Sequence, residues 1–397
     1  RAVNPEFGTM DDFRSLVDAI HAHGMQCMID VVYNHTAPDS WLREHHPEWF
    51  YHRPDGSLGN RFGDWADVVD LDYSHPELWD YQIETLKFWA GIVDGFRCDM
   101  AEMVPVEFWG WAIPQVKEQY PHIIFIAEVY NPNEYRNYIW NGKFDYLYDK
   151  VGLYDTLKAV TCYGQSASAI TGCWQSLEGI QTNMLNFLEN HDEQRFASGF
   201  FGFDAANTLA PLYVSLFLNT APFMVYFGEE VGEKGMDEEG FSGCDGRTTI
   251  FDWWSVASIR RLRKLIASGE YKTLDPEKIA QAGLERGEAE IFCRFAEAVR
   301  LASEDEAIRK GCTYDLCYCN MSSDGFDQNR HYAFLRDHED HTLLIAANFS
   351  QNEANMKLII PEHAFDWLGI PCTEELHPGK VIEVTVPPMD GAVIKLI

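Results

Sequence analysis

The sequence predicts an α/β fold, in which parallel strands alternate with helices, followed by an antiparallel β module. Three observations predict it. Short apolar runs recur between helical patterns up to about residue 268, and only closely spaced β runs separated by polar turns follow residue 313. The 397 residues include 46% hydrophobic and 23% charged residues, which is typical of a globular protein with a large core. Strands that alternate with helices form parallel βα units, whereas short β runs joined by turns form antiparallel sheets.

The first helix and strand are the clearest unit. Thr9 is a typical N-cap, and apolar residues at 13, 16, 17 and 20 follow the i, i+3, i+4, i+7 pattern of a helix. Gly24 stands where a left-handed residue ends a helix. The run "MQCMIDVV" at 25–32 is apolar almost throughout, which predicts a strand buried on both faces.

The same unit recurs along the chain. Further strands are expected at 92–98, 122–128, 144–149, 184–189 and 222–228, and helices at 76–90, 105–119, 151–160, 204–218 and 255–268. Six βα strands are fewer than a closed eight-stranded barrel needs. We therefore expect a (β/α)₈ TIM barrel over residues 1–312 that lacks its first strands in this chain, so that more chain precedes Arg1. Residues 313–397 are expected to form an antiparallel β-sandwich.

One segment interrupts the βα rhythm. Residues 36–74 are rich in Trp, His, Pro and Gly, and a long excursion after a strand is usually functional. We expect an inserted domain here.

The charge excludes some partners. Sixty-two acidic and 31 basic residues leave a net charge of −31, which repels nucleic acid and anionic lipid but not a neutral substrate. No apolar run reaches the roughly 20 residues of a membrane span. The ten Cys are scattered and are expected to be reduced. Oligomeric state and cellular compartment stay open.

Polar side chains stand where the predicted strands end, which is where reactive groups gather in a parallel α/β barrel. They are Asp30, Asn34 and His35 on the first strand, Arg97 and Asp99 on the second, Glu128 on the third, and Asn190, His191 and Asp192 on the fifth. Residues two apart on a strand point the same way, so Arg97 and Asp99 are expected side by side. The guanidinium would keep the Asp99 carboxylate ionised, as a nucleophile requires.

Glu128 follows the apolar run "IIFIA", and partial burial would raise its pKa toward that of a general acid. One ionised and one protonated carboxyl group are what glycoside hydrolysis requires, and a retaining enzyme holds them about 5–5.5 Å apart. Asp192 could stabilise the positive charge of an oxocarbenium-like transition state.

Four motifs carry a family resemblance. "DVVYNH" (30–35), "GFRCD" (95–99), "EVY" (128–130) and "FLENHD" (187–192) resemble, in order, the conserved regions of the α-amylase superfamily, glycoside hydrolase family 13. The resemblance spans nearly the whole chain. It implies that Asp99 is the nucleophile, Glu128 the general acid/base and Asp192 the stabiliser. It further implies that Arg97 positions Asp99, that His35 and His191 bind the glucosyl unit, and that Asp30 supports the site structurally.

The resemblance also implies that segment 36–74 is domain B and that no cofactor is required. Asn34 matches a calcium-ligating position. Many α-amylases carry Lys-His after the nucleophile, where this chain has Glu102 and Met103, so calcium binding and the acceptor preference stay open. Trp41, Trp49 and Trp65 in the insertion are candidates for stacking on sugars.

The expected function is retaining hydrolysis of α-1,4-glucans or maltooligosaccharides. One alternative is a transglycosidase of the glucanotransferase or branching type, which passes the same covalent intermediate to another glycan. A second is an inactive glycan-binding homologue, although such proteins usually lose one of the three carboxylates. A metal-dependent hydrolase with His21 and His23 as ligands is disfavoured, because these residues fall in the last turn of a helix.

Overall fold

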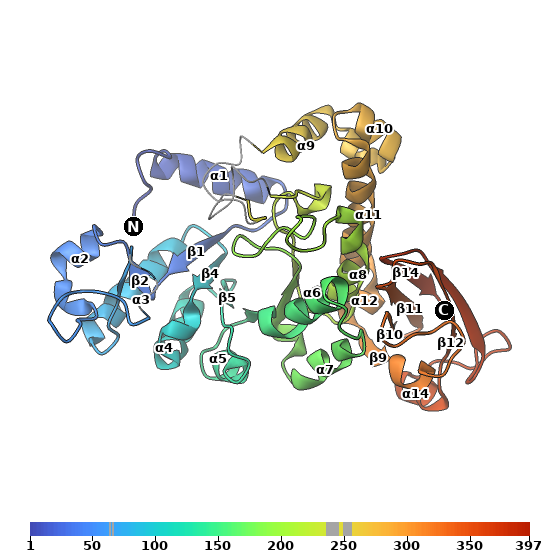
Figure 1. Ribbon diagram of the computed structural model, residues 1–397. Helices are drawn as coiled ribbons and strands as arrows, with labels where there is room; N and C mark the ends of the chain where they lie inside the picture. Colours follow the sequence, from blue (N-terminus) through green and yellow to red (C-terminus); the bar gives the residue numbers. More distant parts are fainter. Residues whose placement is uncertain (63–64, 66, 236–245, 249–255) are drawn as a thin grey trace. The chain divides into compact units, whose positions relative to one another are not determined.

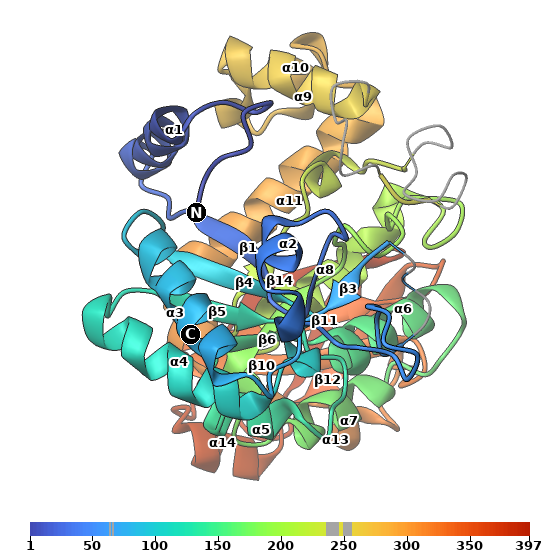
Figure 2. The same cartoon turned by 90° about the vertical axis from the view of Figure 1, so that its left-hand side faces the viewer.

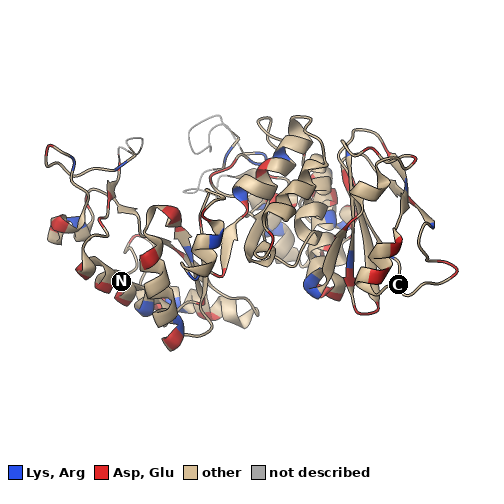
Figure 3. Cartoon of the chain, turned by 90° about the horizontal axis from the view of Figure 1, so that it is seen from below, with Lys and Arg blue, Asp and Glu red and all other residues tan. Residues whose placement is uncertain are grey.

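The structure is a computed structural model that describes residues 1–62, 65, 67–235, 246–248 and 256–397. The chain divides into two compact units, Arg1–Tyr148 and Asp149–Ile397. Asp and Glu (red) and Lys and Arg (blue) are spread over the helices and loops of both units (Figure 3), and 62 acidic against 31 basic residues give the net charge of −31. Among the described residues, no helix has the length and apolar character needed to cross a bilayer.

The first unit is built on a parallel sheet. Its strands β1 (Met28–Val32), β4 (Gly95–Asp99), β5 (Ile124–Ala127) and β6 (Tyr146–Tyr148) are neighbours in that order (Figure 1). Helices alternate with them, namely α1 (Met10–Ala22), α3 (Pro76–Ala90), α4 (Val106–Gln119) and α5 (Tyr135–Trp140). The expected βα alternation is confirmed here.

Local signals explain where α1 begins and ends. The Thr9 hydroxyl accepts a hydrogen bond from the Asp12 N–H, and the Asp12 carboxylate accepts one from the Thr9 N–H, which completes a capping box. Gly24 follows the helix with a φ of 72°, a conformation that glycine adopts without strain. The predicted helix start and stop are both confirmed.

The strand β1 differs from its prediction. Met28 is 38% exposed and Val32 43% exposed, and only Val31 is buried, so the strand is not covered on both faces. Within the first unit, β1 pairs along one edge with β4. Of these two strands, β4 is the buried one. Gly95 allows β4 to approach β5, because a Cβ there would lie 2.8 Å from the Ile124 carbonyl oxygen.

The inserted segment contains little regular structure. Strand β2 (His35–Thr36) pairs antiparallel with β3 (Val69–Asp70), and a short helix α2 (Trp41–His45) and a 3-10 turn η1 (Pro47–Trp49) lie between them in sequence.

The second unit starts with the π-helical turn η3 (Lys150–Tyr154), which leads directly into α6 (Asp155–Cys162). The strands β7 (Met184–Phe187) and β8 (Phe223–Met224) are parallel neighbours. The remaining helices of this part are α7 (Ala169–Ser176), α8 (Leu209–Phe217), α9 (Ala257–Ser268), α10 (Pro276–Gln281), α11 (Arg286–Glu304) and α12 (Glu306–Lys310), of which α9 to α11 follow one another closely (Figure 2). Residue 255 of the expected helix 255–268 lies outside the described residues.

The C-terminal strands form the expected antiparallel module. One sheet has the order β14 (Asp390–Lys395), β11 (His341–Asn348), β10 (His331–His338), β9 (Cys312–Asp315), and β12 (Ala354–Ile359) pairs with β13 (Val381–Val386). Strands β10 and β11 are buried along nearly their whole length, whereas β12 alternates buried and exposed residues. The two central strands of the larger sheet are therefore covered on both faces, whereas its outer strands β9 and β14 are partly exposed and β12 is covered on one face.

A buried arginine joins this module to the helices before it. Arg336 of β10 is 1% exposed, and its guanidinium donates hydrogen bonds to the carbonyl oxygens of Leu218, Ala307 and Ile308. Buried backbone carbonyls need such partners, so the side chain satisfies groups at the ends of two helices.

Candidate active site

Arg97 is the centre of a charged cluster in the first unit. Its Nη1 donates hydrogen bonds to Asp30 Oδ2 at 2.9 Å and to Asp99 Oδ1 at 2.8 Å, and its Nη2 donates to Glu128 Oε2 at 2.8 Å. Nε lies 3.3 Å from the Tyr148 hydroxyl. One guanidinium thus binds three carboxylates through charge-assisted hydrogen bonds, which are stronger than neutral ones.

Strand pairing brings these residues together. Asp30 of β1 is the register partner of Arg97 in β4, and Arg97 and Asp99 are two residues apart on the same strand. Glu128 follows β5 directly, and its N–H donates to the Cys98 carbonyl, which continues the β4–β5 pairing by one residue. Side chains on neighbouring strands at the same level are close enough to interact, so the cluster follows from the register.

Glu128 is held on two sides. Its Oε2 accepts hydrogen bonds from Arg97 and, at 2.9 Å, from the Met100 N–H. Met100 has a φ of 43°, an unusual left-handed conformation for a residue with a side chain. Such strain is often found at functional sites.

The two carboxylates differ in their surroundings. Glu128 is 4% exposed, whereas the Asp99 side chain is 20% exposed. Burial raises the pKa of Glu128 above its usual range, and Asp99 adds to this; Arg97 and the hydrogen bonds from Met100 and Tyr130 act in the opposite direction. Burial alone would lower the pKa of Arg97, but Tyr148 and the three carboxylates outweigh it and raise that pKa. Arg97 is therefore a permanent cation, and the burial of Glu128 favours the protonated form of its carboxyl group.

His35 lies in the first unit, in β2 of the inserted segment. Its ring centroid is 5.6 Å from that of Trp65 with the planes tilted by 50°, and its Nδ1 is 3.3 Å from the Asn34 side-chain nitrogen. Of the other tryptophans proposed to stack on sugars, Trp41 is exposed and stacks on His45 at 4.2 Å, whereas Trp49 is buried against His46. Trp41 and Trp65 are therefore better placed than Trp49 to contact a ligand.

His191 and Asp192 lie in the second unit, after β7. Asn190 Oδ1 accepts hydrogen bonds from the N–H groups of Asp192 and Glu193, both at 2.9 Å, which forms a tight turn after the buried strand. His191 Nε2 is 3.4 Å from Asp192 Oδ2, and the Asp192 side chain is 40% exposed. The turn thus keeps Asn190 inside and presents His191 and Asp192 outward.

A second arginine fixes the segment that follows. Arg195 is fully buried and donates hydrogen bonds to Glu189 Oε2 at 2.8 Å, to Thr248 Oγ1 at 2.8 Å and to the Phe227 carbonyl at 2.7 Å. Its guanidinium lies 4.0 Å from the centre of the Tyr226 ring. Burial raises the pKa of Glu189, while Arg195 lowers it. This pair closes the loop that carries Asp192.

The structure brings Asp30, Arg97, Asp99 and Glu128 into direct contact in the first unit, and it places His191 and Asp192 on one turn of the second. The sequence analysis missed Tyr148 and Arg195. Tyr148 is the last residue of β6 and the last but one of the predicted strand 144–149, so its place near a strand end could have marked it. Arg195 stands three residues after Asp192, and its burial carries no sequence signal of its own.

The residues fit only part of a calcium site. Asn34 and Asp70 are both buried in the β2–β3 region, and Asp70 Oδ1 has no hydrogen-bond partner among the described residues. Within those residues, no group of three or more His, Cys, Asp and Glu side chains could hold a metal ion. The histidines weighed as metal ligands have other contacts, since His21 Nε2 is 2.8 Å from Asp94 Oδ2 and His23 Nδ1 is 2.8 Å from the Ala19 carbonyl.

Comparison with known proteins identifies the family of this chain. Residues 1–358 match the α-amylase catalytic domain family. The α-1,4-glucan:maltose-1-phosphate maltosyltransferase of Rhodospirillum rubrum is 40% identical over 136 residues, which are 32% of this chain and 20% of that protein. The α-amylase MalA of Haloarcula japonica is 28% identical over 252 residues, 59% of this chain and 36% of that protein. The chain thus spans about a fifth of the length of the maltosyltransferase and little more than a third of MalA.

Solved structures of related enzymes have a fold similar to that of this chain. The crystal structure of an α-amylase from Lactobacillus plantarum has a TM-score of 0.64 and 27% identity, and the match covers 100% of this chain and 84% of that one. A debranching enzyme of Nostoc punctiforme has a TM-score of 0.69 at 20% identity, over 99% of this chain and 80% of that one. The predicted barrel class with its C-terminal antiparallel module is confirmed, and the chain belongs to the α-amylase family of glycosyl-active enzymes.

Proposed function

We propose that this protein is a retaining glycoside hydrolase that cleaves α-1,4-linked glucans or maltooligosaccharides through a covalent glycosyl-Asp99 intermediate. The observation that carries the proposal is the shared guanidinium of Arg97, which binds both Asp99 and Glu128 at 2.8 Å. We also propose the domain division 1–312 for the barrel, with the insertion 36–74, and 313–397 for the C-terminal module.

The proposed reaction has two steps. In the first, the Asp99 carboxylate attacks C1 of the glucosyl unit while the bond from C1 to the glycosidic oxygen breaks. Glu128 donates its proton to the departing oxygen. In the second, Glu128, now ionised, takes a proton from water, and the water oxygen attacks C1. The C1–Asp99 bond breaks, and two inversions at C1 leave its configuration retained.

The electrostatics of the first unit support these roles. Arg97 is a permanent cation whose Nη1 donates to Asp99 Oδ1 at 2.8 Å, so it holds the proposed nucleophile in place. Glu128 is buried, and its raised pKa favours the protonated form that the first step needs. When the Glu128 proton leaves, the resulting negative charge remains hydrogen-bonded to Arg97 and the Met100 N–H.

The family resemblance assigns the remaining roles. Asp192 would stabilise the positive charge that develops at C1, and His35 and His191 would donate hydrogen bonds to hydroxyl groups of the same glucosyl unit. Arg97 acts by positioning Asp99, and Asp30 supports Arg97. No cofactor takes part in these steps. If a calcium ion binds, Asn34 and Asp70 are the residues that would hold it, and it would stabilise the insertion.

The test is the substitution Asp99→Asn, with Asp80→Asn on the exposed face of α3 as the matched control. Hydrolysis of maltooligosaccharides by Asp99→Asn should fall at least about 10⁴-fold, because the nucleophile is removed, while the melting temperature stays near that of the wild type. The control should keep its activity. A stable Asp99→Asn protein with more than about a tenth of wild-type turnover would refute the assignment.

Transglycosylation is a second candidate function, because several relatives are named maltosyltransferases. It uses the same glycosyl-Asp99 intermediate, with a glucan hydroxyl in place of water. Incubation with maltotetraose followed by chromatography separates the two. Only shorter products indicate hydrolysis, whereas products longer than the substrate indicate transfer. The other alternative from the sequence, an inactive glycan-binding homologue, requires that neither shorter nor longer products form.

A further inference from the structure

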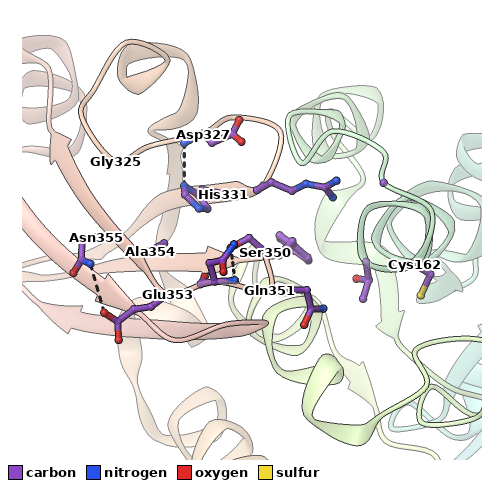
Figure 4. A pocket seen from close by; sticks show the side chains of 14 residues that line it. Cys162, Gly325, Asp327, His331, Ser350, Gln351, Glu353, Ala354 and Asn355 are labelled. Atoms are coloured by element: carbon purple, nitrogen blue, oxygen red, sulfur yellow. Dashed lines mark hydrogen bonds between the residues drawn. The ribbon is translucent and has the colours of Figure 1, made fainter.

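A cavity of about 750 Å³ lies within the second unit, between α6 and the C-terminal strands (Figure 4). Thr161, Cys162 and Gly164 form its helical wall. The other wall consists of the segment before β10, with Asp327 and Arg330, and of the loop 349–355 that joins β11 to β12. None of these residues belongs to the candidate active site. A volume of this size is within the range of small-ligand pockets.

The two walls are fixed to each other by the main chain. The N–H groups of Ala167 and Ser168, just after α6, donate to the carbonyl oxygens of Asn329 and Gln328 at 3.1 and 3.0 Å. The Ser166 hydroxyl adds a bond to the Gln328 carbonyl. The cavity therefore exists without a ligand, and a ligand would not have to order its walls.

The loop 349–355 is equally rigid. Asn348 is fully buried; its side chain donates to the carbonyl oxygens of Asn352 and Pro387 and accepts from the Ser350 N–H. The Ser350 hydroxyl donates to the Asn352 carbonyl at 2.7 Å. These bonds hold the main chain of the turn, so that Gln351 at its tip is presented from a fixed backbone (Figure 4).

Several polar side chains that line the cavity have no partner in the part of the chain that the structure describes. The Arg330 guanidinium makes no hydrogen bond or ion pair there, although its backbone bonds to Asp327 and Phe349. The side-chain amides of Gln351 and Asn352 are likewise unpaired, and the Thr161 hydroxyl is buried without a partner. The side chains of Arg330, Gln351 and Asn352 are therefore available to a ligand, whereas the Thr161 hydroxyl is shielded from solvent.

The side chains that line the cavity favour one class of ligand. The amides donate and accept hydrogen bonds and the guanidinium donates them in several directions, as the hydroxyl groups of a sugar require. Asp327 and Glu353 also line the cavity, and together with the net charge of −31 they disfavour an anion at Arg330. Phe349 and Ala354 give part of the floor an apolar surface. A neutral polyhydroxylated ligand fits this lining better than a charged one.

We propose that this cavity is a second carbohydrate-binding site that holds an α-1,4-glucan segment of the polymeric substrate, with Arg330 and Gln351 as its main hydrogen-bonding residues. The choice of an α-1,4-glucan rests on the proposed function. The existence of a sugar site at the cavity rests on its own lining. Such a site keeps the enzyme on an insoluble glucan between cleavage events, since a second binding site raises the effective concentration of the first.

The test combines Arg330→Met with Gln351→Ala in one protein. Arg286→Met with Gln281→Ala, both on exposed positions of α10 and α11, is the matched control. The cavity variant should bind granular starch about tenfold more weakly than the wild type, because it loses the hydrogen bonds of two side chains. Its kcat/KM on maltotetraose should stay within about twofold, because a short substrate needs no second site. The control should match the wild type in both measurements.

Unchanged starch binding by the cavity variant would overturn the proposal, and so would an equal loss of starch binding and maltotetraose hydrolysis. Calorimetric titration of the wild type and both variants with maltotriose, and separately with inorganic phosphate, shows whether the cavity binds a sugar or an anion. If the wild type cleaves no α-glucan, the proposed function fails. Maltotriose binding that the cavity variant alone loses would then still support the sugar site. Phosphate binding that depends on Arg330, without maltotriose binding, would identify an anion site and refute the proposal.

Discussion

Asp149 allows a quantitative prediction of how the stability of the second unit depends on pH. It is 2% exposed, and its Oδ1 accepts a hydrogen bond from the Leu153 N–H at 2.9 Å at the start of η3. Burial raises its pKa from 3.8 to about 6, although hydrogen bonds from Leu153 and Gly152 act against the increase. Below pH 3.8 the carboxyl group is protonated in both the folded and the unfolded chain. Between pH 3.8 and about 6 the folded chain binds more protons, so stability falls as pH rises through this window.

The size of the effect follows from the same numbers. The pKa difference between 3.8 and about 6, at about 1.4 kcal/mol per unit, makes the ionised carboxyl group cost about 3 kcal/mol of unfolding free energy above pH 6. Asn keeps the oxygen that caps η3 and has no ionisation. Asp149→Asn should therefore be more stable than the wild type at pH 7.5 by up to about 3 kcal/mol, with little difference at pH 4.

Urea unfolding from pH 4 to pH 7.5, followed by circular dichroism, measures this difference directly. Asp366→Asn, on the exposed face of α14 (Glu362–Leu368), is the matched control and should follow the wild type at every pH. A variant whose stability changes with pH in parallel with the wild type would refute the reasoning, and so would one that is less stable at pH 7.5.

Three further predictions concern the site and its supports. Glu128→Gln should lose turnover of maltooligosaccharides but keep much more of its turnover of activated aryl glucosides, because their leaving groups need little protonation. The decrease of kcat/KM at alkaline pH should also disappear in this variant. Equal losses on both substrates would contradict the acid role. Arg195→Met should reduce the unfolding free energy by about 3–5 kcal/mol, because it leaves the Glu189 carboxylate buried without its cation, and Glu189→Gln in the same chain should recover part of the loss in urea titrations. Thr9→Ala should cost about 1 kcal/mol, measured by thermal unfolding, because it removes the capping box of α1; no loss would mean that the cap is redundant.

The sequence predicted those parts of the fold that depend on local signals. The helix 76–90 coincides with α3, and the first helix has the N-cap and the terminal glycine expected of it. Burial of β1 was predicted wrongly, because apolar residues in sequence do not reveal whether both faces of a strand find partners. The long helix α11 (Arg286–Glu304) was missed. Its buried residues Ile291, Cys293 and Phe295 alternate as in a strand, which hides the helical period.

The candidate active site was also predicted only in part from the sequence. The placement of Arg97 beside Asp99 followed from the two-residue repeat of a strand, and the structure has them in contact at 2.8 Å. That the same guanidinium would also reach Asp30 and Glu128 depends on the register between three strands, which no local pattern encodes. The catalytic roles of these residues stay predictions until the variants are measured.

The bonds made by Arg336 have a consequence for how the protein can be dissected. Its guanidinium donates to the carbonyl oxygens of Leu218, Ala307 and Ile308, and the Ala307 carbonyl also accepts from the Gly311 N–H. Removal of the strands after residue 311 would therefore leave the Leu218 and Ile308 carbonyls without these donors in a dry interior. We therefore expect the C-terminal strands and the helices beside them to melt in one transition. The C-terminal strands are then a structural part of the second unit, and they should not survive transfer to another protein as an independent module.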